Sequence, residues 1–354
     1  TNNGLDAIER VRQTLFDTIF LDEHMPGLSG LETLSGLQEV APDVPVVMVT
    51  KSEDEGIMNC AIGNKIADYL IKPVNPNQVL MTIKKILDKK ALIYETVTVN
   101  YRQLFGQLSE EIGSCRSADD WISVYKKLVH WELELEQADN SMKELLASQK
   151  TEANSAFARF IRRHYPKWMR QTAGRPLMSP ALFEETVMPA IGKGEKLFFI
   201  LIDNFRFDQW QAVKEMIADY FVCHEELYFS ILPTATPYAR NSIFSGLMPR
   251  DLAAQYPGLW VDETEEEGKN LLEESLIRAQ LERNQLSPLL SYKKINSNLE
   301  AEELNRHFSE LERNDLHVWV FNFIDMLSHA RTDSRMIREL IADEAAYRSL
   351  TRSW

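Results

Sequence analysis

The sequence has little cysteine, no long apolar run and no excess of positive charge. Its cysteines, Cys60, Cys115 and Cys223, are odd in number and far apart, which argues against a disulfide framework or a cysteine-based zinc site. The most apolar run, Leu197–Ile202, is far shorter than the roughly 18 residues that a membrane span needs. The polar start, TNNG, is no signal peptide. We therefore expect a cytoplasmic protein without membrane partners.

The charge balance is acidic, with 39 Lys and Arg against 53 Asp and Glu and a net charge of −14. Such a chain lacks the basic surface that duplex DNA binding requires, and no helix-turn-helix with a basic recognition helix is visible. We expect no duplex DNA partner. The 44% hydrophobic and 26% charged residues are typical of a globular protein. A length of 354 residues predicts two or three domains, at about 150 residues each.

Residues 1–89 alternate between helical and strand patterns, as in a parallel α/β sheet. Each predicted strand is followed by a polar residue: 17–21 by Asp22, 44–49 by Thr50, and 68–71 by Lys72. The carboxyl ends of parallel strands lie at one edge of a sheet, where ligands bind. The three polar side chains are therefore expected to converge on one site.

Residues from about 92 to 170 lose the strand pattern and follow helical spacing. Trp121, Val124 and Leu128 lie on one helix face, and Ser117 before two aspartates predicts an N-cap. A second helix is expected to start near Ser141 and to end before Pro166. This segment predicts a helical bundle, to which we assign no chemistry.

The α/β alternation returns after about residue 174. Strands are predicted at 197–202, 227–232 and 317–324, with long helices at 270–284 and 299–314 between the last two. The acidic run at 262–267 is expected to be a solvated loop. These elements predict a second parallel sheet covered by helices.

Asp22, Thr50 and Lys72 form a chemically coherent set. A carboxylate can be phosphorylated to an acyl phosphate, while Mg²⁺ neutralises charge and a hydroxyl and an ammonium bind the phosphoryl oxygens. A site of this kind would act as a switch. The alternative is a generic α/β domain whose strands merely end at polar residues.

A longer pattern surrounds this set: DEHMPGLSG at 22–30, VVMVT at 46–50 and GNKIADYLIKP at 63–73. It closely resembles the receiver domain of two-component response regulators. The resemblance implies that Asp22 is the phosphoacceptor, Thr50 the hydroxyl that follows the phosphoryl group, Lys72 its counter-ion and Tyr69 the aromatic switch residue.

The same resemblance implies a magnesium site and a cis peptide bond. Asp22 and the backbone carbonyl of His24 would bind Mg²⁺, and Pro73 would follow the cis bond. The family's acidic metal-binding pair belongs to a strand that we expect to precede Thr1. A sensor histidine kinase would supply the phosphoryl group.

A second set consists of Asp203, Thr236, Asp325 and His329. Asp203 and Asp325 follow predicted strands, and Thr236 lies shortly after a third. Asp325 and His329 are four residues apart, so both could reach one metal if the chain turns helically there. The spacing alone is common and therefore weak evidence.

The segment PTATPYARNSIFSGLMP at 233–249 resembles the nucleophile segment of the alkaline phosphatase superfamily, and LIDNFRFDQW at 201–210 resembles its PglZ branch. The resemblance implies one zinc ion on Asp203 and Thr236 and another on Asp325 and His329. Thr236 would also be the nucleophile, activated by the zinc ions for displacement at phosphorus. A further histidine and an Asp-His pair are expected beyond Trp354. Arg206 and Arg240 could bind substrate phosphate or brace the fold.

Together these segments resemble PorX-like response regulators, which are associated with type IX secretion. The expected fold class is α/β: a flavodoxin-like receiver at 1–89, an all-α bundle at 90–172 and an alkaline-phosphatase-like PglZ domain at 173–354. The expected function is a phosphorylation-controlled regulator that forms a homodimer and has a phosphodiesterase or phosphatase output acting on nucleotide-type phosphate esters. The alternative is a catalytically silent scaffold that recruits a transcription or secretion component.

Overall fold

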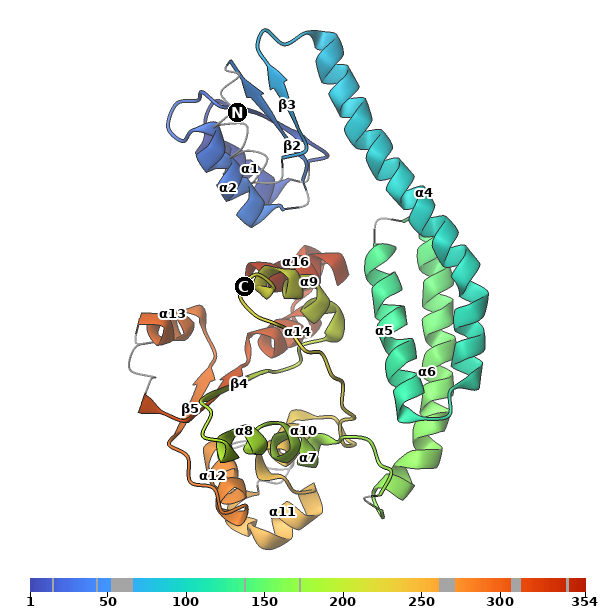
Figure 1. Cartoon of the computed structure of the whole chain (residues 1–354), viewed down its shortest axis with the longest axis vertical. Helices are drawn as coiled ribbons and strands as arrows, with labels where there is room; N and C mark the ends of the chain where they lie inside the picture. The colour runs from blue at the N-terminus through green and yellow to red at the C-terminus, as the bar shows by residue number, and fades with distance from the viewer. Residues whose placement is uncertain are drawn as a thin grey trace. The chain divides into compact units, whose positions relative to one another are not determined.

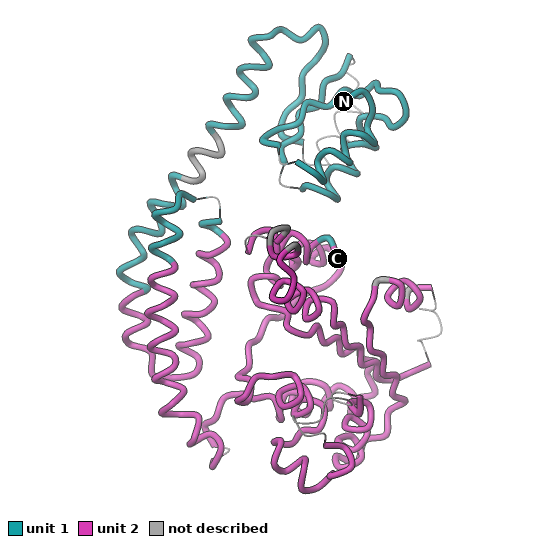
Figure 2. The backbone as a smooth tube through the Cα atoms, turned by 180° about the vertical axis from the view of Figure 1, so that it is seen from behind, with its two compact units in different colours: residues 1–108, 134–146, 353 teal, residues 109–133, 147–352, 354 magenta. Residues whose placement is uncertain are grey.

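The computed structural model describes residues 1–14, 16–42, 44–51, 66–136, 138–171, 173–260, 271–306, 313–341 and 344–354. It divides into two compact units, coloured separately in Figure 2. The first comprises residues 1–108, 134–146 and 353, and the second comprises residues 109–133, 147–352 and 354. Among the described residues, no helix is both long enough and apolar enough to cross a bilayer.

The N-terminal sheet contains β1 (Ile19–Asp22), β2 (Val46–Thr50) and β3 (Asp68–Ile71), which are parallel and adjacent in that order (Figure 1). This confirms the predicted strands. The helices α1 (Gly4–Gln13) and α2 (Gly30–Val40) cover one face through buried Leu21, Leu34, Leu37 and Met48. Ile86 of α4 (Pro76–Ser114) packs on the other face against Val47 and Leu70. Apolar burial on both faces is the usual requirement of a parallel sheet.

Three long helices carry the middle of the chain. They are α4 (Pro76–Ser114), α5 (Ala118–Glu134) and α6 (Asn140–Trp168). The boundary that we predicted at residues 89 and 90 falls inside α4, whose backbone continues without a break. The predicted cap of α5 is present, since the Asp120 amide donates to Ser117 Oγ (3.1 Å) and the Ser117 amide donates to the Asp120 carboxylate (2.8 Å).

The predicted end of α6 before Pro166 is wrong, because the helix continues to Trp168. The Trp168 side chain is buried and makes edge contacts with Phe160 and Phe229. The Met169 amide still bonds to the Tyr165 carbonyl at 3.1 Å. One missing N–H in the last turn costs less than the aromatic packing that holds the turn in place.

The second sheet contains β4 (Leu197–Ile202), β6 (Leu316–Phe321) and β5 (Leu290–Ile295), parallel and adjacent in that order. Its core face packs against α7 (Ser179–Thr186), α10 (Thr236–Ser245) and α12 (Glu273–Arg283). The remaining elements are α8 (Met188–Gly192), α9 (Phe207–Ile217), α11 (Pro249–Gln255), η1 (Pro257–Leu259), α13 (Asn298–Arg306), α14 (Phe323–Asp333), α15 (Arg335–Leu340) and α16 (Glu344–Ser353).

Two strand predictions differ from this sheet. Residues 227–232 form no strand and make only an isolated bridge between Phe229 and Met178, because other partners take their amides. Sequence reasoning missed β5, whose two central lysines hide the pattern of a strand that is buried at its ends, Leu290 and Ile295. The last strand ends at Phe321, so Asp325 lies in α14.

Parts of other predictions lie outside the described residues. The predicted helix at 270–284 corresponds to α12, and that at 299–314 to α13, but residues 307–312 are not described. The acidic run at 262–267 and residues 63–65 of the receiver motif also lie outside the described ranges.

Candidate functional site

The first candidate site lies at the carboxyl edge of the N-terminal sheet. Asp22 ends β1 opposite Val49, and Thr50 ends β2 opposite Ile71. Lys72 follows β3 directly, and its ammonium group contacts the Asp22 carboxylate. The parallel register therefore brings together the polar strand ends that the sequence singled out.

The surroundings of Asp22 favour its ionised form. Burial would raise the pKa of Asp22, but the bonds from Lys72 and from the His24 amide (3.1 Å) outweigh burial and lower it. An ionised carboxylate is the form that can attack phosphorus or bind a cation. Thr50 is buried and Tyr69 is 36% exposed, while the Lys72–Pro73 bond is cis as the resemblance implied.

Glu23 is a feature of this site that sequence reasoning passed over. Its side chain is buried, and its Oε2 atom has no hydrogen-bond partner within the described part of the chain. Burial raises the pKa of Glu23. The sequence could have indicated Glu23, because it is a charged residue directly after Asp22 in the motif at 22–30.

The second candidate site lies at the carboxyl edge of the other sheet. Asp203 follows β4, and Asn204 has a left-handed backbone (φ 57°) that turns the chain away. Thr236 is the first residue of α10, and its hydroxyl is 3.5 Å from Asp203 Oδ2. The partial positive charge of a helix N-terminus would favour an anionic ligand beside Thr236.

Arg240 lies in α10, one turn after Thr236, and is buried. Its Nη1 atom donates to Asp203 Oδ2 (2.6 Å) and to Asn322 Oδ1 (3.3 Å), and its Nε atom contacts Glu273. Glu273 is fully buried and also contacts Tyr292, whose pKa is raised by burial and by the Glu273 charge. Arg240 thus links α10, α12 and the ends of β4 and β6.

Asp325 and His329 lie one turn apart on α14, so the helical turn that their pairing requires is present. Asp325 Oδ1 is 3.7 Å from His329 Nε2, and the His329 side chain is 73% exposed. Burial and then the charge of Asp203 raise the pKa of Asp325. The Asp203 carboxylate therefore lies close enough to Asp325 for its charge to act on that group.

The carboxylate, imidazole and hydroxyl groups at this edge include ligands that zinc prefers, but they are fewer than the three or four protein ligands that a zinc ion usually has. In the ranges that the structure describes, no three His, Cys, Asp or Glu side chains gather closely enough to hold a metal. Each expected zinc ion has two ligands among these residues, and one of them, Asp203, also forms an ion pair with Arg240. The Asp203 and Asp325 carboxylates nevertheless create a negative potential that a divalent cation would relieve.

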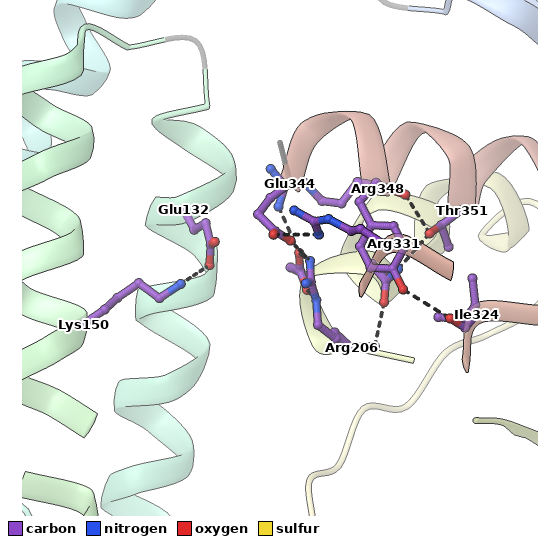
Figure 3. A network of polar contacts seen from close by, with 11 residues as sticks. Glu132, Lys150, Arg206, Ile324, Arg331, Glu344, Arg348 and Thr351 are labelled. Carbon is purple, nitrogen blue, oxygen red and sulfur yellow. Dashed lines mark hydrogen bonds and ion pairs between the residues drawn. The ribbon is translucent and has the colours of Figure 1, made fainter. Parts of the chain in front are cut away.

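Arg206 belongs to a separate polar network, drawn in Figure 3. Its guanidinium bonds Asp208 through two atoms (2.9 and 2.7 Å), contacts Glu344 at 2.6 Å and lies over the Tyr347 ring. Arg348 of α16 also bonds Asp208, at 2.9 Å. Arg206 thus connects α9 with α16, and its role in binding phosphate stays a prediction.

A cavity of about 370 Å³ lies beside the second site. Its walls come from the residues after Asp203 and from the segment before Thr236, and they are rich in aromatic rings. They comprise Phe205, Arg206, Phe207, Trp210, His224, Glu225, Glu226, Leu227 and Tyr228. The volume and lining suit a small organic ligand.

Comparison with family models accounts for nearly all of these segments. Residues 1–84 match the response regulator receiver domain, residues 91–169 the PorX response regulator linker domain, and residues 182–352 the BREX system PglZ alkaline phosphatase-like domain. The fold and both sites therefore define a two-component response regulator that carries an alkaline-phosphatase-like domain. The chain carries a CheY-like receiver, a helical linker and a PglZ domain, which is the domain arrangement of the PorX-like response regulators.

Curated relatives match the receiver part. The transcriptional regulatory protein ZraR of Klebsiella oxytoca is 31% identical over 109 residues, covering 31% of this chain and 25% of that protein. A nitrate/nitrite response regulator homologue of Haemophilus influenzae is 31% identical over 96 residues, covering 27% and 46%. The chain thus spans between about a quarter and a half of the length of these relatives.

Solved structures also match this part of the chain. A LuxR-family DNA-binding response regulator from Staphylococcus aureus is 30% identical, covering 24% of this chain and 72% of that one, with a TM-score of 0.23. The receiver domain of the sensor histidine kinase PA1611 from Pseudomonas aeruginosa PAO1, solved with magnesium in its active-site cleft, is 19% identical. It covers 25% of this chain and 74% of that one, with a TM-score of 0.24.

Proposed function

We propose that this response regulator is a phosphorylation-controlled phosphodiesterase or phosphatase, with Thr236 as its nucleophile. The observation that carries the proposal is the position of Thr236 at the start of α10, 3.5 Å from Asp203 and at the same sheet edge as Asp325. This edge gathers a nucleophile, carboxylates and an imidazole. Its layout suits displacement at phosphorus.

Asp203 and Thr236 would hold one zinc ion, and Asp325 and His329 the other. When bound, zinc would supply Lewis-acid stabilisation of charge on the phosphoryl oxygens. The Thr236 oxygen forms a bond to phosphorus as the bond to the leaving oxygen breaks, and Asp203 is placed to accept the hydroxyl proton. Water then cleaves the phosphothreonine and restores Thr236.

Nucleotide-type phosphate esters are the substrate class that the neighbouring cavity supports. Phe205, Phe207, Trp210 and Tyr228 line it, and aromatic rings stack well on nucleobases. A base in this cavity would place its phosphate toward the edge that carries Asp203. Arg206 and Arg240 are candidate phosphate contacts, although carboxylates already engage both guanidinium groups.

The receiver would control this output. A sensor histidine kinase would phosphorylate Asp22, with Mg²⁺ held by Asp22 and the His24 carbonyl. Lys72 would bind the phosphoryl oxygens, and Thr50 and Tyr69 would move with the switch. The match to the PorX linker domain supports a role in type IX secretion. We further propose that the protein acts in the cytoplasm and forms a homodimer when phosphorylated. We assign the receiver to 1–89, the bundle to 90–172 and PglZ to 173–354.

One observation favours a second function, a silent scaffold that binds a transcription or secretion component. Arg240 donates to Asp203, so a guanidinium group already binds a carboxylate oxygen that zinc would need as a ligand. Metal analysis of the full-length protein, joined to a phosphodiester hydrolysis assay, separates the two functions. Metal-free protein without turnover would favour the scaffold.

A further inference from the structure

The segment 224–232 precedes Thr236 in the chain and contacts the helical linker. It follows α9 along the chain, forms neither helix nor strand, and ends four residues before Thr236. Its hydrogen bonds and packing go to helices α5, α6, α7 and α9 and to Leu177 before α7. A segment without a strand of its own is therefore fixed by neighbours from two domains.

Glu225 anchors the beginning of this segment. One carboxylate oxygen accepts from Trp210 (3.0 Å) and Gln211 (2.6 Å) of α9, and Lys214 approaches it at 3.3 Å. The other oxygen lies 3.0 Å from the ammonium group of Lys126 in α5. Although burial opposes ionisation, these bonds lower the pKa of Glu225 to about 2. The carboxylate is therefore charged and bonded at any physiological pH.

The end of the segment is anchored to α6. Phe229 makes ring contacts with Phe157 and Trp168, at centroid distances of 6.1 and 5.3 Å. Its amide donates to the Leu177 carbonyl (2.9 Å), and Ile231, fully buried, donates to Ser179 Oγ (3.2 Å). The last anchor is the Leu232 amide, which donates to the Tyr165 hydroxyl at 2.8 Å.

We propose that Lys126 and Tyr165 of the helical linker are positioning residues for Thr236. The proposal rests on the function assigned to Thr236 above. Only Pro233, Thr234 and Ala235 separate the Tyr165 anchor from the nucleophile. An anchor so close limits how far the start of α10 can drift, and a displacement of about 1 Å can cost up to about 100-fold in rate. The linker thereby forms part of the active site's support.

The test compares variants of the full chain. Tyr165→Phe removes the hydroxyl that accepts from Leu232 and keeps the ring. Lys126→Ala removes the anchor at Glu225. Lys127→Ala is the matched control, because Lys127 is the next residue of α5 but pairs with Glu111, 2.6 Å away inside the linker. Lys126→Arg should restore what Lys126→Ala loses.

Two readouts separate positioning from general stability. We expect faster amide hydrogen exchange in peptides covering 226–240 for Tyr165→Phe and Lys126→Ala, with Lys127→Ala unchanged. We also expect kcat for a dinucleotide to fall about ten-fold in Tyr165→Phe with KM changed less than two-fold, because Leu232 lies outside the lining of the cavity. Lys126→Ala, which releases Glu225 in that lining, should lower kcat and change KM as well.

Unchanged exchange in both variants would overturn the proposal, and so would faster exchange with unaltered kcat. Loss of kcat in Lys127→Ala of the same size would also overturn it. If the unaltered protein shows no turnover at all, the proposed function fails, and exchange at the Thr236 amide alone decides whether the linker holds this segment.

Discussion

The Asp22 carboxylate contacts the Lys72 ammonium group and accepts a hydrogen bond from the His24 amide, and both contacts favour the ionised carboxylate. The pKa of Asp22 lies below its usual range because the bonds from Lys72 and His24 outweigh burial. The carboxylate is thus ionised wherever a kinase would act. Lys72 already occupies the position from which an ammonium group would neutralise a phosphoryl oxygen.

Replacing Asp22 by Asn should abolish phosphorylation. The amide keeps the size of the side chain but lacks a nucleophilic oxygen, so acetyl phosphate in Mg²⁺ should leave no acid-labile phosphate on the full-length protein. Phosphate uptake is measured by mass spectrometry, with Asp17→Asn as the control. Equal uptake by Asp22→Asn would show that another residue is the phosphoacceptor.

Arg240 limits what sequence reasoning can say about the second site. The motif placed Thr236 and Asp203 together because strand ends and helix starts converge at one sheet edge. The partners of Arg240, Glu273 and Asn322, lie in or beside a helix and a strand that the sequence predicts, but nothing in these segments indicates a contact with Arg240. Such long-range pairing depends on tertiary packing, which a local pattern does not encode.

At the scale of elements, α9 and α16 are joined by a buried network. Asp208 is 6% exposed and bonds Arg206 beside it and Arg348 of α16 (Figure 3). Although burial opposes the charge, the two arginines lower the pKa of Asp208. The folded state therefore binds the Asp208 proton less readily than the unfolded state does.

Asp208→Asn should destabilise the protein by about 3 kcal/mol near neutral pH, because it leaves two guanidinium groups without their shared carboxylate. Since the folded pKa is lowered, this contribution is complete above the unfolded value of about 3.8 and is lost as pH falls through the folded value. Urea unfolding of both proteins across pH measures the difference. Asp219→Asn, exposed at the end of α9, is the control. A difference that stays constant down to the lowest pH would contradict this account.

Secondary structure was predictable where one pattern dominates. The strands β1, β2, β3 and β4 and the start of α5 follow the sequence because apolar runs and caps act locally. Helix α6 passes Pro166 because Trp168 packs against Phe229. Residues 227–232 form no strand because their amides donate to the Tyr165 and Ser179 hydroxyls instead. The strand β5 carries lysines that a sheet-edge position tolerates.

At the scale of the molecule, the receiver offers an apolar face for pairing. Leu80, Met81 and Leu87 of α4 are 64%, 70% and 45% exposed, and Tyr69 of the same domain is 36% exposed. The segment 52–64, which we also expect to change on phosphorylation, lies outside the described residues. A phosphoryl group need favour one receiver state by only a few kcal/mol to shift the population.

We expect beryllofluoride with Mg²⁺ to convert the protein to a dimer in sedimentation experiments, and Leu80→Lys with Leu87→Lys to prevent this. Asp22→Asn, which cannot bind the mimic in the same way, should stay monomeric. An unchanged mass in protein shown to have bound beryllofluoride would leave the receiver as a tether only.

The most direct test of the account compares Thr236→Ala with Thr234→Ala in the zinc-loaded, full-length protein. Thr234 lies two residues away, in the loop before α10, and is exposed, so the loss of its hydroxyl should leave hydrolysis of a dinucleotide within about two-fold. Thr236→Ala should lose at least about 1,000-fold in kcat while thermal unfolding stays close to that of the unaltered protein. Hydrolysis by Thr236→Ala at the unaltered rate would contradict the assignment of the nucleophile.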